Sequence, residues 1–289
     1  MSGQMNDEQI DVFQPRTFQL MRFPTIFDSK YHQGVIQREN LPPKIVDELK
    51  KLLFLAIDVE SMDPKCNSEA MSIGYATVDG FGYLRSKGTI YFPFTVLNAD
   101  PKRLEWWKSD SNKEVFEKHV KKSREMNLDP ESGEPWDSPA YEKPTHFSIA
   151  NQLENFLEVL NTPINSYMTR HIISDSIFNF EVINNMLKQY IEKFDGGLAY
   201  KNGEFGISNI VADSYYASLY PGGLSSNQIS DESLTQKVLD RYKVSVPDNI
   251  PPRDNNPSND AHRLAYEFTA IYRAREMESY KLEQLGVYE

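Results

Sequence analysis

Four acidic residues, taken from three separate stretches of the chain, have the types and spacing for chemistry. Asp58 and Glu60 follow the apolar run of residues 52–57, which is typical of a central strand covered on both faces. In a strand, residues i and i+2 point to the same side, so these two carboxylates share one face. Two buried like charges are costly unless a cation or hydrogen-bond donors neutralise them. The pair therefore predicts a cation site, unless both side chains lie in water beyond the strand end.

Asp175 and Asp260 are the candidates for the rest of this site. Asp175 stands where a predicted strand gives way to a helix, and Asp260 begins the last predicted helix. Four carboxylates brought together can hold two divalent cations about 3.5–4 Å apart, one activating water and the other stabilising the leaving oxygen of a phosphodiester. All-oxygen ligation suits Mg²⁺ or Mn²⁺. The alternative for Asp175 and Asp260 is that each caps the N-terminus of its helix.

The elements that must position these residues alternate between strands and helices. Strand patterns cover residues 52–60, 70–78, 88–94, 164–169 and 206–217, the last turning helical near Asp213. Helical patterns cover residues 44–51, 101–122, 146–160, 174–194, 231–242 and 260–285. Short turns join the first three strands, which predicts an antiparallel meander. The whole order predicts an α/β fold, in which a mixed sheet of this meander and further parallel strands is flanked by helices.

The composition describes an acidic globular protein. The 289 residues carry a net charge of −11, and 39% of them are hydrophobic. Proteins that bind nucleic acid by coating its phosphates are usually basic, so any such contact must be local and metal-assisted. The single cysteine, Cys66, excludes an internal disulfide framework. No apolar run reaches about 18 residues, so we expect no membrane span or signal peptide and a cytoplasmic location, in a cell or in the host of a virus or phage.

At the acidic positions the chain resembles the DEDD superfamily of 3′–5′ exonucleases, which has a ribonuclease-H-like fold. Three stretches carry the resemblance: residues 54–62 (FLAIDVESM), 170–175 (RHIISD) and 260–265 (DAHRLA). They are similar to a strand ending in Asp-x-Glu, a motif with Arg five residues before Asp, and an Asp-Ala that opens a helix. The tryptophan pair at 106–107 is similar to an element of the phage DexA-type exonucleases, which with the small bacterial exoribonucleases form the most similar branch. The resemblance covers residues 52–275.

The resemblance implies a metal-dependent 3′–5′ exonuclease that hydrolyses terminal phosphodiesters of RNA or DNA to nucleoside monophosphates. Two Mg²⁺ or Mn²⁺ ions would be held by Asp58, Glu60, Asp175 and Asp260. Single-stranded or 3′-terminal RNA or DNA would contact Trp106, Trp107, Arg170 and Asn255. Adjacent residues cannot share one helix face, so one tryptophan belongs in the core and the other can lie half-exposed near the site; core packing of both is nevertheless the more common outcome.

Two departures from the family pattern affect what this site can do. Family members carry a general base, either His five residues or Tyr four residues before the last Asp, and here these positions are Asn255 and Asn256. Asparagine cannot accept a proton from water as imidazole does. The family also places Phe before its second-motif Asp, where this chain has Ser174. A rival alignment would put Asn179 in the ligand position and replace that carboxylate with an amide.

The missing base leaves a second function open, and the N-terminal residues add a third idea. A catalytically impaired, exonuclease-like protein would act as a nucleic-acid-binding, structural or assembly module. We expect residues 1–50 to form an N-terminal extension and residues 51–289 to form the exonuclease-like domain. The extension is too apolar for a free tail, with Phe18, Leu20, Met21, Phe23 and Ile26. Residues 15–50 are therefore expected to pack on the core, to self-associate or to dock on a partner.

Overall fold

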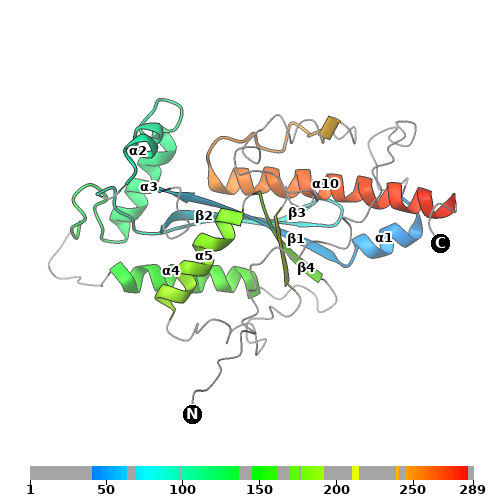
Figure 1. The fold of residues 1–289 in the computed structure, drawn as a ribbon, viewed down its shortest axis with the longest axis horizontal. Coiled ribbons are helices and arrows are strands. Elements are labelled where there is room, and N and C mark those ends of the chain that lie inside the picture. The colour runs from blue at the N-terminus through cyan, green and yellow to red at the C-terminus, as the bar shows by residue number, and fades with distance from the viewer. Residues whose placement is uncertain are drawn as a thin grey trace, which may run out of the picture.

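A mixed five-stranded sheet forms the centre of this computed structural model, in the order β3-β2-β1-β4-β5 (Figure 1). The strands are β1 (Leu52–Ser61), β2 (Ala70–Asp79), β3 (Leu84–Tyr91), β4 (Thr169–Ser174) and β5 (Ile210–Ser214). β1 pairs antiparallel with β2, and β2 antiparallel with β3. β4 runs parallel to β1, and β5 parallel to β4. The predicted α/β class, with an antiparallel meander extended by parallel strands, is confirmed.

The structure describes nine stretches of the chain, and the following statements concern those residues: 41–63, 69–97, 99–136, 145–161, 169–175, 177–191, 210–214, 239–240 and 245–285. Its helices are α1 (Pro43–Leu49), α2 (Pro101–Trp107), α3 (Lys113–Glu125), α4 (Thr145–Asn161), α5 (Ile177–Tyr190) and α10 (Pro257–Gln284). None of the helices in these stretches is both long and apolar enough to cross a membrane. The predicted helix at 231–242 falls almost entirely outside them.

β1 separates two hydrophobic clusters because its side chains alternate between the two faces of the sheet. Leu55, Ile57 and Val59 pack with the apolar stripes of α4 and α5. Phe54 and Ala56 belong to the cluster on the other face, which α10 covers. Figure 1 shows this layering, with α10 on one side of the sheet and α4 and α5 on the other. The prediction that the first strand is covered on both faces is confirmed.

Several predicted boundaries are wrong. The fourth strand begins at Thr169, where the prediction for residues 164–169 ends, because its β-branched residues pair with β1. The next helix begins at Ile177 instead of residue 174, and the last helix at Pro257 instead of Asp260. Asp213, expected to open a helical turn, lies in β5. The helical stretch 101–122 divides into α2 and α3 at Ser-Asp-Ser-Asn, whose short polar side chains favour turns over helix interiors.

The end of the predicted N-terminal extension belongs to the packed fold. Ile45 and Leu49 of α1 are buried, and Leu49 is fully covered. Their cluster includes Tyr272 and Met277 from the second half of α10. α1 thus lies against the C-terminal part of α10, as Figure 1 shows. Residues 1–40, which include most of the predicted docking segment, lie outside the described residues.

Candidate active site

The strand registers bring three of the predicted acidic residues to one edge of the sheet. Asp58 and Glu60 follow Phe54 and Ala56 on the β1 face that α10 covers, as the alternation requires. In the parallel pairing of β1 with β4, Ala56 lies opposite Ile173. Asp175 directly follows β4, two residues beyond Ile173, and Asp58 lies two residues beyond Ala56. Their side chains are therefore carried at the same end of neighbouring strands.

The fourth acidic residue, Asp260, lies on α10, and the first turn of this helix packs directly on the sheet. Gly74 of β2 lies opposite Asp58, and a Cβ atom on Gly74 would lie 2.1 Å from the backbone of Pro257. Glycine is the residue that permits this close approach. The contact fixes the start of the helix over the acidic end of β1. Asp260, in that first turn, consequently faces Asp58 and Glu60.

The carboxylates converge. Oxygens of Asp58, Glu60 and Asp260 all lie within 4.8 Å of one another, a grouping that could hold a metal ion. The N-cap alternative for Asp260 is wrong, because α10 begins at Pro257 and the Asp260 carboxylate accepts a hydrogen bond from the Asp254 N–H at 3.0 Å. Asp175 lies beside this group, since its charge raises the pKa of both Asp58 and Glu60.

Burial and mutual repulsion hold protons on this site. Burial, followed by the charge of Glu60, raises the pKa of Asp58 well above its usual range. Burial also raises the pKa of Glu60 to about 8, against the opposing charge of Arg103, and that of Asp260 to about 6. Near neutral pH such a cluster binds either protons or a cation. The donor set is made of carboxylate oxygens, which suits a hard divalent cation such as Mg²⁺ or Mn²⁺.

Arg253 places a positive charge beside the carboxylates. The sequence patterns do not indicate that this residue belongs to the site. Its Nη1 lies 3.3 Å from Oδ2 of Asp175, and its Nη2 lies 3.3 Å from Oε2 of the buried Glu267. Glu267 also accepts a hydrogen bond from Arg263. The charge of Arg253 lowers the pKa of Asp58 and of Asp260, opposing the larger effect of burial. Arg253 comes from the loop before α10, where no periodic pattern exists to predict its direction.

Asp175 and Asn179, the two candidates for the acidic position of the second motif, lie in contact with each other. The Asn179 amide nitrogen donates to Ser174 Oγ at 2.7 Å and to Asp175 Oδ1 at 3.3 Å. Asn179 is buried, whereas Asp175 is partly exposed and is the member whose charge acts on Asp58. The geometry therefore favours Asp175 as the acidic member and Asn179 as a residue that orients it. Arg170 lies in β4, opposite Leu53, and its side chain falls outside the described residues.

The two tryptophans of α2 differ, one in the core and one half-exposed, so the favoured expectation that both pack in the core is wrong. Trp107 is fully buried and donates from Nε1 to the backbone oxygen of Ser61 at 3.2 Å. Trp106 is 37% exposed, and the Arg103 guanidinium carbon lies 4.1 Å from the centre of its ring. Nη2 of Arg103 lies 3.6 Å from Oε2 of Glu60. Arg103, which sequence reasoning missed, thus joins Trp106 to the carboxylates; its i, i+3 spacing from Trp106 was the available signal.

Asn255, where the exonucleases that the chain resembles carry a general base, joins the loop before α10 to the turn between α2 and α3. Its Nδ2 donates to Oδ1 of Asn112 at 2.6 Å, and Asn112 in turn donates to the backbone oxygen of Trp106 at 2.9 Å. Asn255 has a φ of 58°, a left-handed conformation that asparagine tolerates better than most residues. Asn112 is buried. The side chain of Asn255 therefore serves a structural contact next to the site.

Comparisons with known proteins add nothing to this picture: no protein-family model matches the chain, and no curated protein is similar to it in sequence.

Proposed function

We propose that this protein is a metal-dependent 3′–5′ exonuclease acting on RNA or DNA. The observation that carries the proposal is the convergence of Asp58, Glu60 and Asp260 within 4.8 Å, with Asp175 beside them. The strand order β3-β2-β1-β4-β5, antiparallel on one side of β1 and parallel on the other, supports a ribonuclease-H-like fold. That fold and these four positions are what the DEDD resemblance requires.

The oxygen donors of the four carboxylates suit a pair of divalent cations, and three of them converge. Asp58, Glu60, Asp175 and Asp260 would hold Mg²⁺ or Mn²⁺, which when bound supply an activated water and neutralise charge on the scissile phosphate. The protein keeps Glu60 in place through Arg103, and Asp175 through Asn179 and Arg253. Burial of Glu60 limits access of bulk water to that side of the site.

Trp106 and Arg103 are placed to receive the terminal nucleotide. The exposed ring of Trp106 offers an apolar face for a base, and stacking of this kind depends little on base identity. Arg103 carries a positive charge between this ring and Glu60, where a terminal phosphate would lie. The pair would orient a 3′ end toward the carboxylates without selecting a sequence. Trp107 supports it from the core by anchoring α2 to Ser61.

A second candidate function is a binding module with impaired catalysis, favoured by Asn255. An amide at the position of the general base accepts no proton from water, and this one is hydrogen-bonded to Asn112. Such a protein would bind single strands with the same residues but release no nucleotides. The two candidates share the acidic site and differ only in turnover.

Incubation of the full-length protein with 5′-labelled single-stranded RNA and DNA in Mn²⁺ tests the proposal. We expect a ladder that shortens from the 3′ end and releases nucleoside monophosphates. The Asp58→Asn and Asp260→Asn variants should abolish the ladder, while Asp47→Asn, on an exposed side chain of α1, should leave it unchanged. A wild type that binds the strands without shortening them would favour the binding module. Equal ladders from wild type and Asp58→Asn would mean a contaminating nuclease and overturn the proposal.

A further inference from the structure

A groove of about 740 Å³ lies along α3 and the segment that follows it, outside the acidic site. Phe116 and Val120 form its apolar part, and Trp136, 44% exposed, stands at its side. Its charged members are Lys108, Lys113, Lys121, Arg124, Glu117, Glu125 and Glu131. This volume is within the range of binding pockets for molecules the size of a nucleotide.

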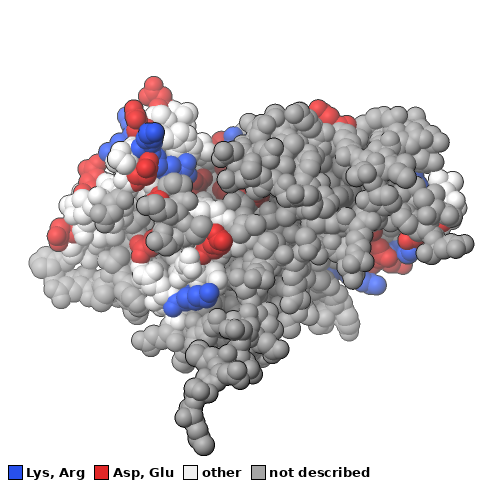
Figure 2. All heavy atoms as spheres, in the orientation of Figure 1, with Lys and Arg blue, Asp and Glu red and all other residues white. Residues whose placement is uncertain are grey.

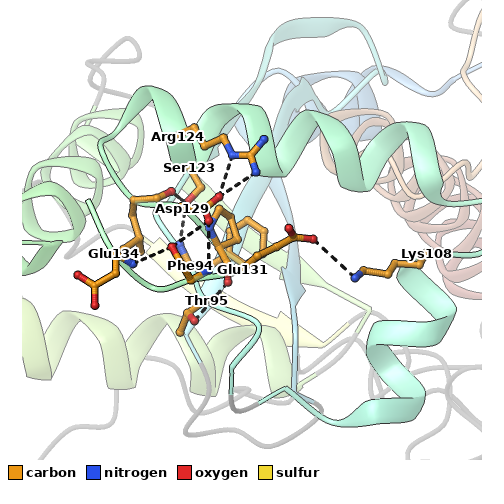
Figure 3. A network of polar contacts seen from close by, with 11 residues as sticks. Phe94, Thr95, Lys108, Ser123, Arg124, Asp129, Glu131 and Glu134 are labelled. Atoms are coloured by element: carbon orange, nitrogen blue, oxygen red, sulfur yellow. Dashed lines mark hydrogen bonds and ion pairs between the residues drawn. The ribbon is translucent and has the colours of Figure 1, made fainter. Parts of the chain in front are cut away.

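Polar contacts hold the side of the groove in one arrangement, as Figure 3 shows. Arg124 donates from Nε to Oδ1 of Asp129 at 2.9 Å, and Asp129 accepts the backbone N–H of Ser132 at 3.1 Å. Ser123 Oγ donates to the backbone oxygen of Leu128 at 2.9 Å. Lys108 Nζ lies 3.9 Å from Oε1 of Glu131. A groove fixed in this way requires little reorganisation to accept a ligand.

The groove repeats the aromatic and cationic pairing found beside the carboxylates. The Arg124 guanidinium carbon lies 4.0 Å from the centre of the Trp136 ring, as the Arg103 guanidinium carbon lies 4.1 Å from that of Trp106. Both tryptophans keep more than a third of their surface exposed. Exposed aromatic rings next to arginine are the usual platforms on which single-stranded nucleic acid stacks its bases. Two such platforms, one on α2 and one in the segment after α3, could receive bases of one strand.

The groove is lined by four lysine and arginine side chains and three glutamates, and the basic excess lies in α2 and α3. Residues 101–125 contain eight lysine and arginine residues against five aspartate and glutamate residues, whereas the chain has a net charge of −11. Figure 2 shows lysine and arginine side chains gathered over α2 and α3, with acidic ones between them. A local excess of positive charge is what an acidic protein needs to contact a phosphate backbone.

α2 connects the acidic site to the groove. Arg103, in its first half, contacts Glu60, and Lys108, which ends the helix, lines the groove. Five residues of α-helix span about 7.5 Å, roughly the length of one extended nucleotide step. A strand that ends at the carboxylates therefore reaches the groove after a few nucleotides.

We propose that this groove binds the nucleotides on the 5′ side of the single strand whose 3′ end lies at the carboxylates. The inference rests on the proposed exonuclease function and adds to it a preference for longer strands. Trp136 stacks on a base, and Lys113, Lys121 and Lys108 contact phosphates. Hydrolysis of a trinucleotide, which reaches Lys108 at the near end of the groove and leaves the rest of it empty, does not depend on Trp136.

Binding and hydrolysis of two strand lengths test the inference. Fluorescence anisotropy in EDTA measures the affinity for a labelled trinucleotide and a labelled dodecanucleotide, each as RNA and as DNA. We expect Trp136→Ala to weaken binding of the longer strand at least about fivefold and to leave the shorter one unchanged. Trp136→Phe should restore most of the affinity, and Lys121→Glu should reduce its salt dependence. The control Tyr83→Ala removes an exposed aromatic residue elsewhere and should change neither.

The outcomes separate failure of this inference from failure of the proposed function. If both lengths are hydrolysed in Mn²⁺ equally well by wild type and Trp136→Ala, and bind equally, the groove inference is overturned while the exonuclease stands. If binding depends on Trp136 and no nucleotide is ever released, the groove is supported and the exonuclease is overturned. A polyglutamate peptide that binds through Lys121 while the oligonucleotides do not would assign the groove to an acidic protein segment and overturn the inference.

Discussion

Arg253 is a cation inside a group of carboxylates, so its removal should strengthen the binding of another cation. In the Arg253→Gln variant the charge beside Asp175 disappears, and its electrostatic effect on Asp58 and Asp260 disappears with it. We expect Mn²⁺ to bind about fivefold more tightly, which corresponds to an interaction of about 1 kcal/mol between partly solvated charges. Isothermal titration calorimetry with Mn²⁺ measures this change directly.

Arg263→Gln is the matched control for that change. Arg263 shares the Glu267 carboxylate with Arg253, so each variant leaves this buried acid with one partner fewer. Both should lose stability by a similar amount, about 1–3 kcal/mol. Tighter Mn²⁺ binding in both variants, or in neither, would contradict the role given to Arg253.

The pKa of Glu60 predicts how the metal-free protein responds to pH. Its pKa is about 8 in the folded state and about 4.5 in the unfolded chain, so the folded state binds the proton more tightly. The resulting stabilisation is complete below about pH 4.5 and is lost as pH rises through 8. In EDTA, the free energy of unfolding should fall by about 1 kcal/mol between about pH 7 and pH 9.

Urea unfolding at a series of pH values measures this fall, and two comparisons identify its source. The Glu60→Gln variant should show a smaller change with pH, because its amide does not titrate. Excess Mg²⁺ should reduce the change in the wild type, since a bound cation favours the ionised carboxylates that repel one another in its absence. A wild type whose stability in EDTA rises over this interval would refute the assignment.

The residues of the site differ in how far the sequence could identify them. Alternation along one strand was enough to pair Asp58 with Glu60, because the pairing depends only on their spacing. Asp260 was selected through a family resemblance, and its meeting with Asp58 depends on how α10 docks. Arg253 and Asn112 could not be found, since they come from a loop and a turn whose directions are set by packing. The wrong cap interpretation of Asp260 followed from a helix start misplaced by three residues.

Among the elements, the packing of the first turn of α10 on β2 is the contact on which the acidic site most depends. Alanine at Gly74 would place a methyl group against the Pro257 backbone, which cannot move without moving Asp260. We expect Gly74→Ala to cost about 3 kcal/mol of stability and to weaken Mn²⁺ binding. Urea unfolding and calorimetry with Mn²⁺ measure the two effects.

Gly88→Ala provides the comparison within the same sheet. A methyl group at Gly88 of β3 meets the hydroxyl end of Tyr75, a side chain that can move away. Its effect on stability should be smaller, and Mn²⁺ should bind as in the wild type. If Gly74→Ala binds Mn²⁺ normally, α10 does not position Asp260 in the way described here.

The accuracy of the predicted elements followed the strength of the local signal. β1 and β2 end within one residue of their predicted ends, since long apolar runs and a tight turn define them. The predicted range of the fourth strand, residues 164–169, lies too early in the chain. Residues 164–169 and Thr169–Ser174 are both compatible with a strand, and only pairing with β1 decides between them. α10 begins at Pro257 because proline is favoured at the first helical position, three residues before the acidic residue that the prediction takes as the start.

On the scale of the whole molecule, α1, at the start of the described residues, packs against the C-terminal half of α10. Leu49 is fully buried in a cluster with Tyr272 and Met277 of α10. We expect Leu49→Ala to lower the free energy of unfolding by about 3 kcal/mol, the usual effect of removing a buried leucine side chain. Asp47→Ala, on the exposed face of the same helix, should change it by less than about 0.5 kcal/mol.

Urea unfolding compares these variants. An equal and small effect of both would place α1 outside the cooperative unit and would support the boundary predicted between residues 50 and 51. A large effect of Leu49→Ala would extend that unit to α1.

The position of the carboxylates on β1 and α10 has a consequence for the order of folding. The β1–β2–β3 meander forms from neighbours in the sequence, whereas docking of α10 closes a loop of about 200 residues between Asp58 and Asp260. We therefore expect the meander to form early and α10 to dock last. A chain still emerging from the ribosome would carry Asp58 and Glu60 without Asp260. On the proposed function, hydrolysis would begin only after residues 257–284 are made and α10 has docked.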